Sequence, residues 1–241
     1  MKRIMSSLLF LFCSFLVVAQ KQGTIEPSGN IITRDVTINS FNSIKADGLY
    51  ELVLTQGDKE SVKIEADDNL QNLFKVSNDG STLVIDMPEL KNSNINFNDE
   101  NHEHKLNLKV YVTFKQLNAI DVGIIGTIRC TTPLKADAFK IDSKNVGNIE
   151  LQLTADKLTI NNKGVGNITL TGSANNAIIT NAGVGKFNGE DLIVQTMDIN
   201  NSGVGNADVH VEKDLKVKES FLGKVTNSGN AKEHKMDGVE I

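Results

Sequence analysis

A repeat of about twenty residues constrains this chain more than any other feature of its sequence. Six nine-residue stretches align without a gap and begin 18 to 21 residues apart. In order they read IDVGIIGTI, IDSKNVGNI, INNKGVGNI, ITNAGVGKF, INNSGVGNA and VKESFLGKV. A unit of this length cannot bury an apolar row by itself, so the units are expected to stack and share one core.

Three positions of the repeat are apolar in all copies, and we expect their side chains to point inward. The first position holds Ile120, Ile141, Ile160, Ile179, Ile199 and Val217. The sixth holds Ile125, Val146, Val165, Val184, Val204 and Leu222, and the ninth holds Ile128, Ile149, Ile168, Phe187, Ala207 and Val225. Another apolar residue two places before the first position gives the period of two that indicates a strand.

The seventh position is glycine in every copy, at Gly126, Gly147, Gly166, Gly185, Gly205 and Gly223. A corner with positive φ explains this, because glycine has no Cβ to clash there. Each unit therefore predicts a strand, a glycine corner and a second strand. Crossovers between parallel strands are right-handed in nearly all cases. The sequence predicts an all-β fold, a right-handed parallel β-helix, or β-solenoid, with about 18–21 residues per coil.

The third position is polar although it lies on the inward period. It holds Ser143, Asn162, Asn181 and Asn201 in four successive copies. Stacked coils lie about 4.8 Å apart. We expect these side chains to form a ladder in which amides bond one another along the axis, with a structural role.

The chain divides into five segments by composition. Residues 1–19 have a basic start at Lys2 and Arg3 and an apolar run to Val18, which predicts a signal peptide and not a membrane span. Residues 20–35 are expected to be a linker, 36–117 divergent first coils or a β cap, 118–226 the regular solenoid, and 227–241 a polar cap or tail. The expected location is the periplasm, the cell surface or the extracellular space, with no transmembrane segment in the mature chain.

Shorter strands are expected upstream of the repeat, where Tyr50, Val62 and Leu83 each begin an alternating apolar run. Asp67 and Asp68 precede an apolar cluster and predict the cap of one helical turn. Asn78-Asp79-Gly80 predicts a tight turn.

Several of these stretches resemble a known family. They are FNSIKADGLYELVLTQG from Phe41 to Gly57, the strand LKVYVTF before Leu117, and the GVGN corners. The chain resembles the head GIN domain of autotransporter adhesins, common in exported proteins of Bacteroidetes, over about residues 36–226. Lys115 and Gln116 stand where the family pattern has a proline. The resemblance implies a right-handed β-solenoid, an adhesion role suggested by the family name, and no catalytic residues.

Composition excludes some functions. The formal net charge is −5, which becomes −7 when Lys2 and Arg3 are removed, so nucleic acid is not expected as a partner. Cys130 is the one cysteine after residue 19, and its position on the inward period predicts a buried, inert thiol. We expect no cofactor.

Few residues suggest metal or catalytic chemistry. His102-Glu103-His104 could hold a transition metal, but it lies in a polar insertion at 91–104 that we interpret as a solvated loop. Calcium coils need an aspartate at the ninth position, which is apolar here. Acids of the repeats are spread over the coils, at Asp142, Glu150, Asp156, Asp191, Asp208 and Asp214. We therefore expect no enzyme, and a polysaccharide-active β-helix lyase or hydrolase is the alternative.

The eighth position points outward and is mostly polar. Its row includes Asn148, Asn167, Lys186 and Asn206, which we predict as the ligand-binding residues. Such an evenly spaced row suits an extended partner, such as a glycan or another cell-envelope polymer. The expected function is that of a non-catalytic, adhesin-like binding or structural module of the cell envelope.

Overall fold

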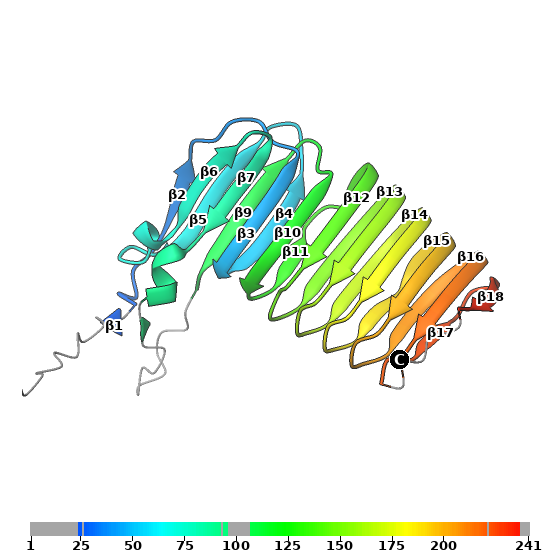
Figure 1. Cartoon of the computed structure of the whole chain (residues 1–241). Coiled ribbons are helices and arrows are strands. Elements are labelled where there is room, and N and C mark those ends of the chain that lie inside the picture. Colours follow the sequence, from blue (N-terminus) through cyan, green and yellow to red (C-terminus); the bar gives the residue numbers. More distant parts are fainter. Residues whose placement is uncertain (1–23, 26, 93, 96–106, 221, 237–241) are drawn as a thin grey trace, which may run out of the picture.

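The computed structural model describes residues 24–25, 27–92, 94–95, 107–220 and 222–236, and in these the chain is nearly all β. Stacked parallel strands form a β-solenoid of about six turns (Figure 1). The expected signal peptide and the His102-Glu103-His104 motif lie outside the described residues. No helix in the described part of the chain is long and apolar enough to cross a membrane.

The regular coils are long strands that pair in parallel with the next repeat. They are β12 (Leu134–Ser143), β13 (Ile149–Asn162), β14 (Ile168–Asn181), β15 (Phe187–Asn201) and β16 (Ala207–Glu219). The register aligns equivalent repeat positions, so Ile141, Ile160, Ile179, Ile199 and Val217 lie in one column. The strand residues predicted to be inward at the first position are at most 2% exposed, which confirms them as core.

The positive-φ glycine corners are confirmed in five of the six copies, and Gly223 of the last copy is the exception. Gly126, Gly147, Gly166, Gly185 and Gly205 have φ between 127° and 150°, in the region that favours glycine. The stacking adds a second reason: a Cβ on Gly166 would lie 2.2 Å from the backbone oxygen of Gly147 in the preceding coil. A side chain at this position would therefore force adjacent coils apart.

The prediction for the sixth position is wrong, because its side chains point to solvent. Ile125, Val146, Val165, Val184, Val204 and Leu222 are 47–59% exposed. The period of two continues from the strand into the corner, so the third and fifth positions face inward and the sixth faces outward. These residues lie at the outer tip of each corner.

The polar ladder is confirmed. Asn162, Asn181 and Asn201 are at most 6% exposed. The Nδ2 of Asn162 donates to Oδ1 of Asn181, and the Nδ2 of Asn181 donates to Oδ1 of Asn201, both at 2.7 Å. Ser143 is buried in the same column, where its Oγ accepts from the backbone N–H of Asn145 at 3.2 Å.

The first coils do not stack in chain order. The coil of β3 (Ser43–Leu49) and β4 (Glu51–Gln56) lies between two coils that come later in the chain. On one side β3 pairs with β10 (Ala119–Ile125) and β4 with β11 (Ile128–Cys130). On the other side they pair with β7 (Thr82–Asp86) and β9 (Lys109–Phe114). Residues 36–117 thus contribute divergent coils and a cap.

The cap consists of antiparallel strands at this end. β2 (Ile31–Val36) pairs with β5 (Ser61–Asp67), which pairs with β9, and β6 (Lys75–Asp79) forms a hairpin with β7 around Gly80. β2 begins inside the segment that we expected to be a linker. The remaining short elements are β1 (Thr24–Ile25), β8 (Asn94–Ile95), η1 (Gln71–Leu73) and η2 (Pro88–Asn92).

The predicted capping role of Asp67 and Asp68 is wrong. The short helix η1 has Leu70 at its N-cap and no side-chain capping bond. Asp67 instead accepts the N–H of Gly29 at 2.7 Å, and Asp68 accepts the hydroxyl of Ser28 at 2.6 Å. These carboxylates therefore fasten the segment before β2. At the other end of the solenoid, β17 (Val225–Asn227) and β18 (Lys232–Lys235) pair with the outer edge of β16.

Candidate functional site

The predicted ligand row lies together on one edge of the solenoid, directly after the glycine corners. Asn167, Lys186 and Asn206 are exposed and Asn148 is half-buried. The Oδ1 atoms of Asn148 and Asn167 accept the backbone N–H of the following coil, at 3.2 and 3.0 Å. The Nζ of Lys186 lies 2.6 Å from Asp208. Three of the four residues therefore already use side-chain groups within the solenoid wall, whereas no side-chain hydrogen bond of Asn206 is found in the described part of the chain.

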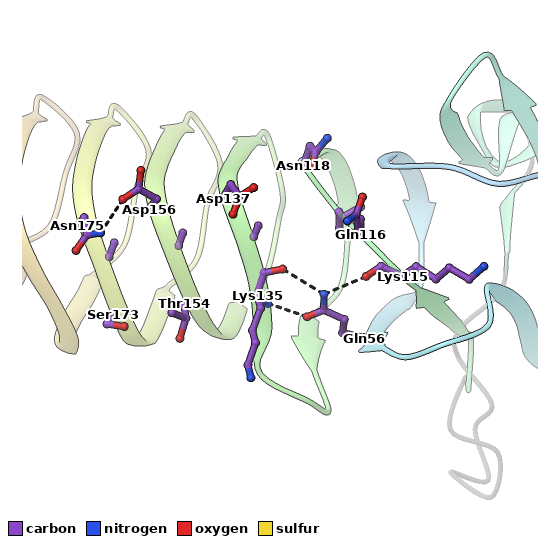
Figure 2. Close-up of a pocket in the computed structure, with 14 residues that line it drawn as sticks. Gln56, Lys115, Gln116, Asn118, Lys135, Asp137, Thr154, Asp156, Ser173 and Asn175 are labelled. Carbon is purple, nitrogen blue, oxygen red and sulfur yellow. Dashed lines mark hydrogen bonds between the residues drawn. The ribbon is translucent and has the colours of Figure 1, made fainter.

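A larger recess lies at the opposite bend of the coils. It is a groove with a volume of about 730 Å³, and its residues come from β4, β12, β13, β14 and the connection between β9 and β10 (Figure 2). Its polar lining residues are Gln56, Lys115, Gln116, Asn118, Lys135, Asp137, Thr154, Asp156, Ser173 and Asn175. A smaller hollow of about 430 Å³ shares Lys115 and Gln116, so recesses flank this connection on both sides.

A column of alanines lies along the groove. Ala136, Ala155 and Ala174 line the groove in three successive coils and pair in register. Ala155 and Ala174 are buried, and in the next two coils the same column continues as the larger Val194 and Val211, also buried; the groove does not extend there. The groove therefore follows the solenoid axis over the coils that carry alanine.

Gln56 holds the cap side of the groove to the first regular coil. Its Nε2 donates to the backbone oxygens of Lys115 and Lys135, at 3.0 and 3.1 Å, and its Oε1 accepts the N–H of Lys135 at 2.7 Å. Figure 2 shows this amide between the two segments. Three bonds from one side chain fix the spacing of segments that are far apart in the chain.

The groove carries groups of both charges and neutral amides and hydroxyls. Asp137 and Asp156 come from adjacent coils, and both are exposed. The carboxylate of Asp156 accepts a hydrogen bond from Asn175 at 2.6 Å. The lining suits a ligand rich in hydroxyl groups, which donates and accepts hydrogen bonds along its length.

Comparison with known proteins agrees with the resemblance seen in the sequence. Residues 40–231 match the family described as "Putative auto-transporter adhesin, head GIN domain". The chain belongs to this family. No match is found among curated proteins.

Solved structures similar to this head GIN domain include proteins of the same kind. A putative adhesin from Bacteroides fragilis is 27% identical, with a TM-score of 0.73, over 88% of this chain and 100% of that chain. A putative adhesin from Parabacteroides distasonis is 20% identical, with a TM-score of 0.64, over 89% and 96%. A putative lipid binding protein from the same species is 19% identical, with a TM-score of 0.63, over 88% and 95%. At such identities the last two show the shared fold alone.

One cluster of titratable groups in this head GIN domain lies on the cap, around Glu65 of β5. Glu65 accepts hydrogen bonds from Asn107, Tyr111 and Lys109, at 2.8, 3.1 and 3.3 Å. Burial raises the pKa of Glu65, but these three donors outweigh it and leave that pKa below its usual value. Burial and the adjacent Glu65 raise the pKa of Tyr111. The cluster has its donors and acceptors matched, which is typical of a structural network.

The remaining predicted features carry no site. Cys130 is half-buried, not buried as predicted, because β11 has only three residues and ends at this position. Its Sγ accepts the N–H of Gln152 at 3.1 Å. Within the described residues no three His, Cys, Asp or Glu side chains gather so as to hold a metal ion. The groove itself was not predicted. Its cap side depends on strand pairings between segments outside the repeat, and the repeat pattern does not indicate these pairings.

Proposed function

We propose that this chain is a non-catalytic binding module of the cell envelope, and that its groove holds a hydroxyl-rich polymer such as a glycan. The observation that supports the proposal is the groove itself: it is open, polar, and runs along the axis over three coils. Backbone pairing on both sides holds its lining strands rigid. A rigid surface loses little entropy when a ligand binds, so several weak contacts add effectively.

The groove is a better candidate than the eighth-position row that we predicted from the sequence. Asn118, Gln116 and Asp137 are exposed groove residues for which no side-chain hydrogen bond is found among the described residues. In the row, Asn148 and Asn167 already use their oxygens on the backbone. Free donors and acceptors exchange water for a ligand at lower cost than groups that first have to break a bond.

The test compares the two surfaces in one chain. Gln116→Ala, Asn118→Ala and Asp137→Ala form the groove variant, and Asn167→Ser, Lys186→Ser and Asn206→Ser form the row variant. Both change exposed residues, so the β-rich circular dichroism should be retained. Wild type is screened on a glycan array and in pull-downs with envelope polysaccharide, and both variants are assayed on the polymers it retains.

We expect the groove variant to lose binding and the row variant to keep it. Loss in the row variant alone would move the site to the row. A wild-type protein that retains no polysaccharide would refute the proposal. Release of new reducing or unsaturated ends from a polysaccharide, abolished by Asp137→Asn and Asp156→Asn, would replace it by the enzyme alternative.

A further inference from the structure

The corner tips form a continuous aliphatic ridge along one edge of the solenoid. The tip ridge consists of Ile125, Val146, Val165, Val184, Val204 and Leu222, each about half exposed. Successive tips from Ile125 to Val204 are joined by parallel β-bridges, and the N–H of Gly205 donates to the oxygen of Leu222 at 3.0 Å. The backbone therefore holds six branched side chains in a straight line, about 4.8 Å apart.

A polar row runs along each side of the tip ridge. The row two places before the tips holds Gly123, Lys144, Lys163, Ala182, Ser202 and Ser220. The row two places after them holds Thr127, Asn148, Asn167, Lys186, Asn206 and Lys224. All-aliphatic tips between two polar rows form a contiguous apolar strip, and such strips on a protein surface usually mark a contact with another molecule.

We propose that the tip ridge is an interface between two copies of this chain, related by a two-fold axis that runs the ridges antiparallel. Full overlap then places Ile125 against Leu222, Val146 against Val204, and Val165 against Val184. Each row meets the same row of the other copy in reverse order. A two-fold contact uses one patch on both copies, which a strip with a regular repeat readily provides.

The lysines of the two rows select this register. At full overlap Lys144 faces Ser202, Lys163 faces Ala182, Lys186 faces Asn167 and Lys224 faces Thr127, so no two lysines meet. A slip of one coil in one direction brings Lys163 against Lys163. A slip in the other direction brings Lys186 against Lys186. Facing like charges disfavour the first slipped arrangement; in the second the penalty is smaller, because Lys186 is paired with Asp208 at 2.6 Å.

The alternative occupants fit less well. An anionic lipid surface would need a net positive border, but Lys186 and Lys224 are already paired with Asp208 and Glu219, at 2.6 and 3.4 Å. A parallel pair of chains would bring both caps to one end. Figure 1 shows the helical turns of the cap on the same side of the molecule as the corner tips, where two caps would obstruct each other.

The size of the contact predicts a weak dimer. Six half-exposed aliphatic side chains amount to roughly 200–350 Å² of apolar surface per copy. With the flanking rows the two copies together bury about 1,000 Å², at the lower limit of specific interfaces. We therefore expect dimers at roughly 100 µM and above.

Sedimentation velocity between about 10 and 500 µM tests the proposal. Wild type should show a concentration-dependent dimer, and the pair Val165→Asp with Val184→Asp should stay monomeric. The matched control is Ile178→Asp with Ile193→Asp, which changes aliphatic residues that are 45% and 46% exposed but lie off the ridge. The control should dimerise as wild type does. A monomer at every wild-type concentration, or dimerisation of the ridge variant, would overturn the proposal.

Cysteine cross-linking tests the register in a Cys130→Ser background. Val165→Cys mixed with Val184→Cys should form a disulfide-linked dimer, as should Val146→Cys with Val204→Cys. Val146→Cys with Val184→Cys should not. Efficient linkage of Val165→Cys to itself would indicate either parallel ridges or the antiparallel register slipped by one coil, and either would overturn the proposed arrangement. Binding of the monomer to phosphatidylcholine vesicles containing phosphatidylglycerol, lost in the ridge variant, would assign the ridge to a lipid surface instead.

Discussion

The buried asparagine ladder should contribute measurably to stability, and Asn181→Ala tests it. Asn181 is 2% exposed and bonds its neighbours in both directions at 2.7 Å. Removing its amide leaves the Nδ2 of Asn162 without its acceptor and the Oδ1 of Asn201 without its donor. A buried polar group that loses its partner costs about 1–3 kcal/mol. Two such groups predict a loss of about 2–6 kcal/mol.

Urea unfolding followed by circular dichroism measures this loss as a lower midpoint with an unchanged slope. Asn167→Ala is the matched control, because its Oδ1 also accepts a hydrogen bond from an adjacent coil, here from the backbone N–H of Lys186 at 3.0 Å, but at an exposed position. Water can replace that bond, so the control should lose less than about 1 kcal/mol. Equal losses in the two variants would refute the argument that burial gives the ladder its strength.

Four further results are expected. Val165→Asp should keep a cooperative melting transition within a few degrees of wild type, because Val165 is 51% exposed; complete unfolding would place it in the core. Gly166→Ala should destabilise by several kcal/mol more than Gly80→Ala in thermal melts, since both glycines have positive φ but a Cβ on Gly80 meets nothing within 4 Å. The lowered pKa of Glu65 adds stability that is present above the unfolded pKa, about 4.3, and is lost as the pH falls through the lower folded pKa. The urea midpoints of wild type and Glu65→Gln should therefore converge between about pH 5 and 3. A gap that stays constant over this range would contradict the lowered pKa of Glu65. EDTA should leave the melting temperature unchanged, and a shift of many degrees would reveal a required metal.

Much of the regular solenoid could be predicted from the sequence because its contacts repeat at a fixed spacing. The inward columns, the glycine corners and the asparagine ladder each depend on equivalent positions of adjacent repeats. The sixth position shows where the reasoning failed. Its residues are apolar, but the alternation of the strand continues through the corner and directs them outward. Periodicity was a better guide than hydrophobicity at this position.

The groove could not be predicted, because it depends on contacts between segments that share no repeat. Gln56 bonds Lys115 and Lys135, which are 59 and 79 residues away. Its role follows from the position of β4 between β9 and β11, and the sequence gives no periodic sign of that order. The alanines at the bend were visible, but a small residue marks a hollow only when its neighbours in space are known.

The interleaved order of the first coils determines when each strand can pair in a chain that emerges N-terminus first from a ribosome or a translocation pore. Strands β3 and β4 are made early, but their partners on one side end at Phe114 and on the other at Cys130. Strand β3 can pair with β7 once Asp86 has been made, but β4 keeps both edges unpaired until Phe114, when nearly half of the chain has appeared. Unpaired strand edges are the part of a nascent chain that a chaperone must shield. From β12 onward, each new coil can pair with the edge of a coil that has already folded. The second half of the chain can therefore fold as fast as it is synthesised or translocated.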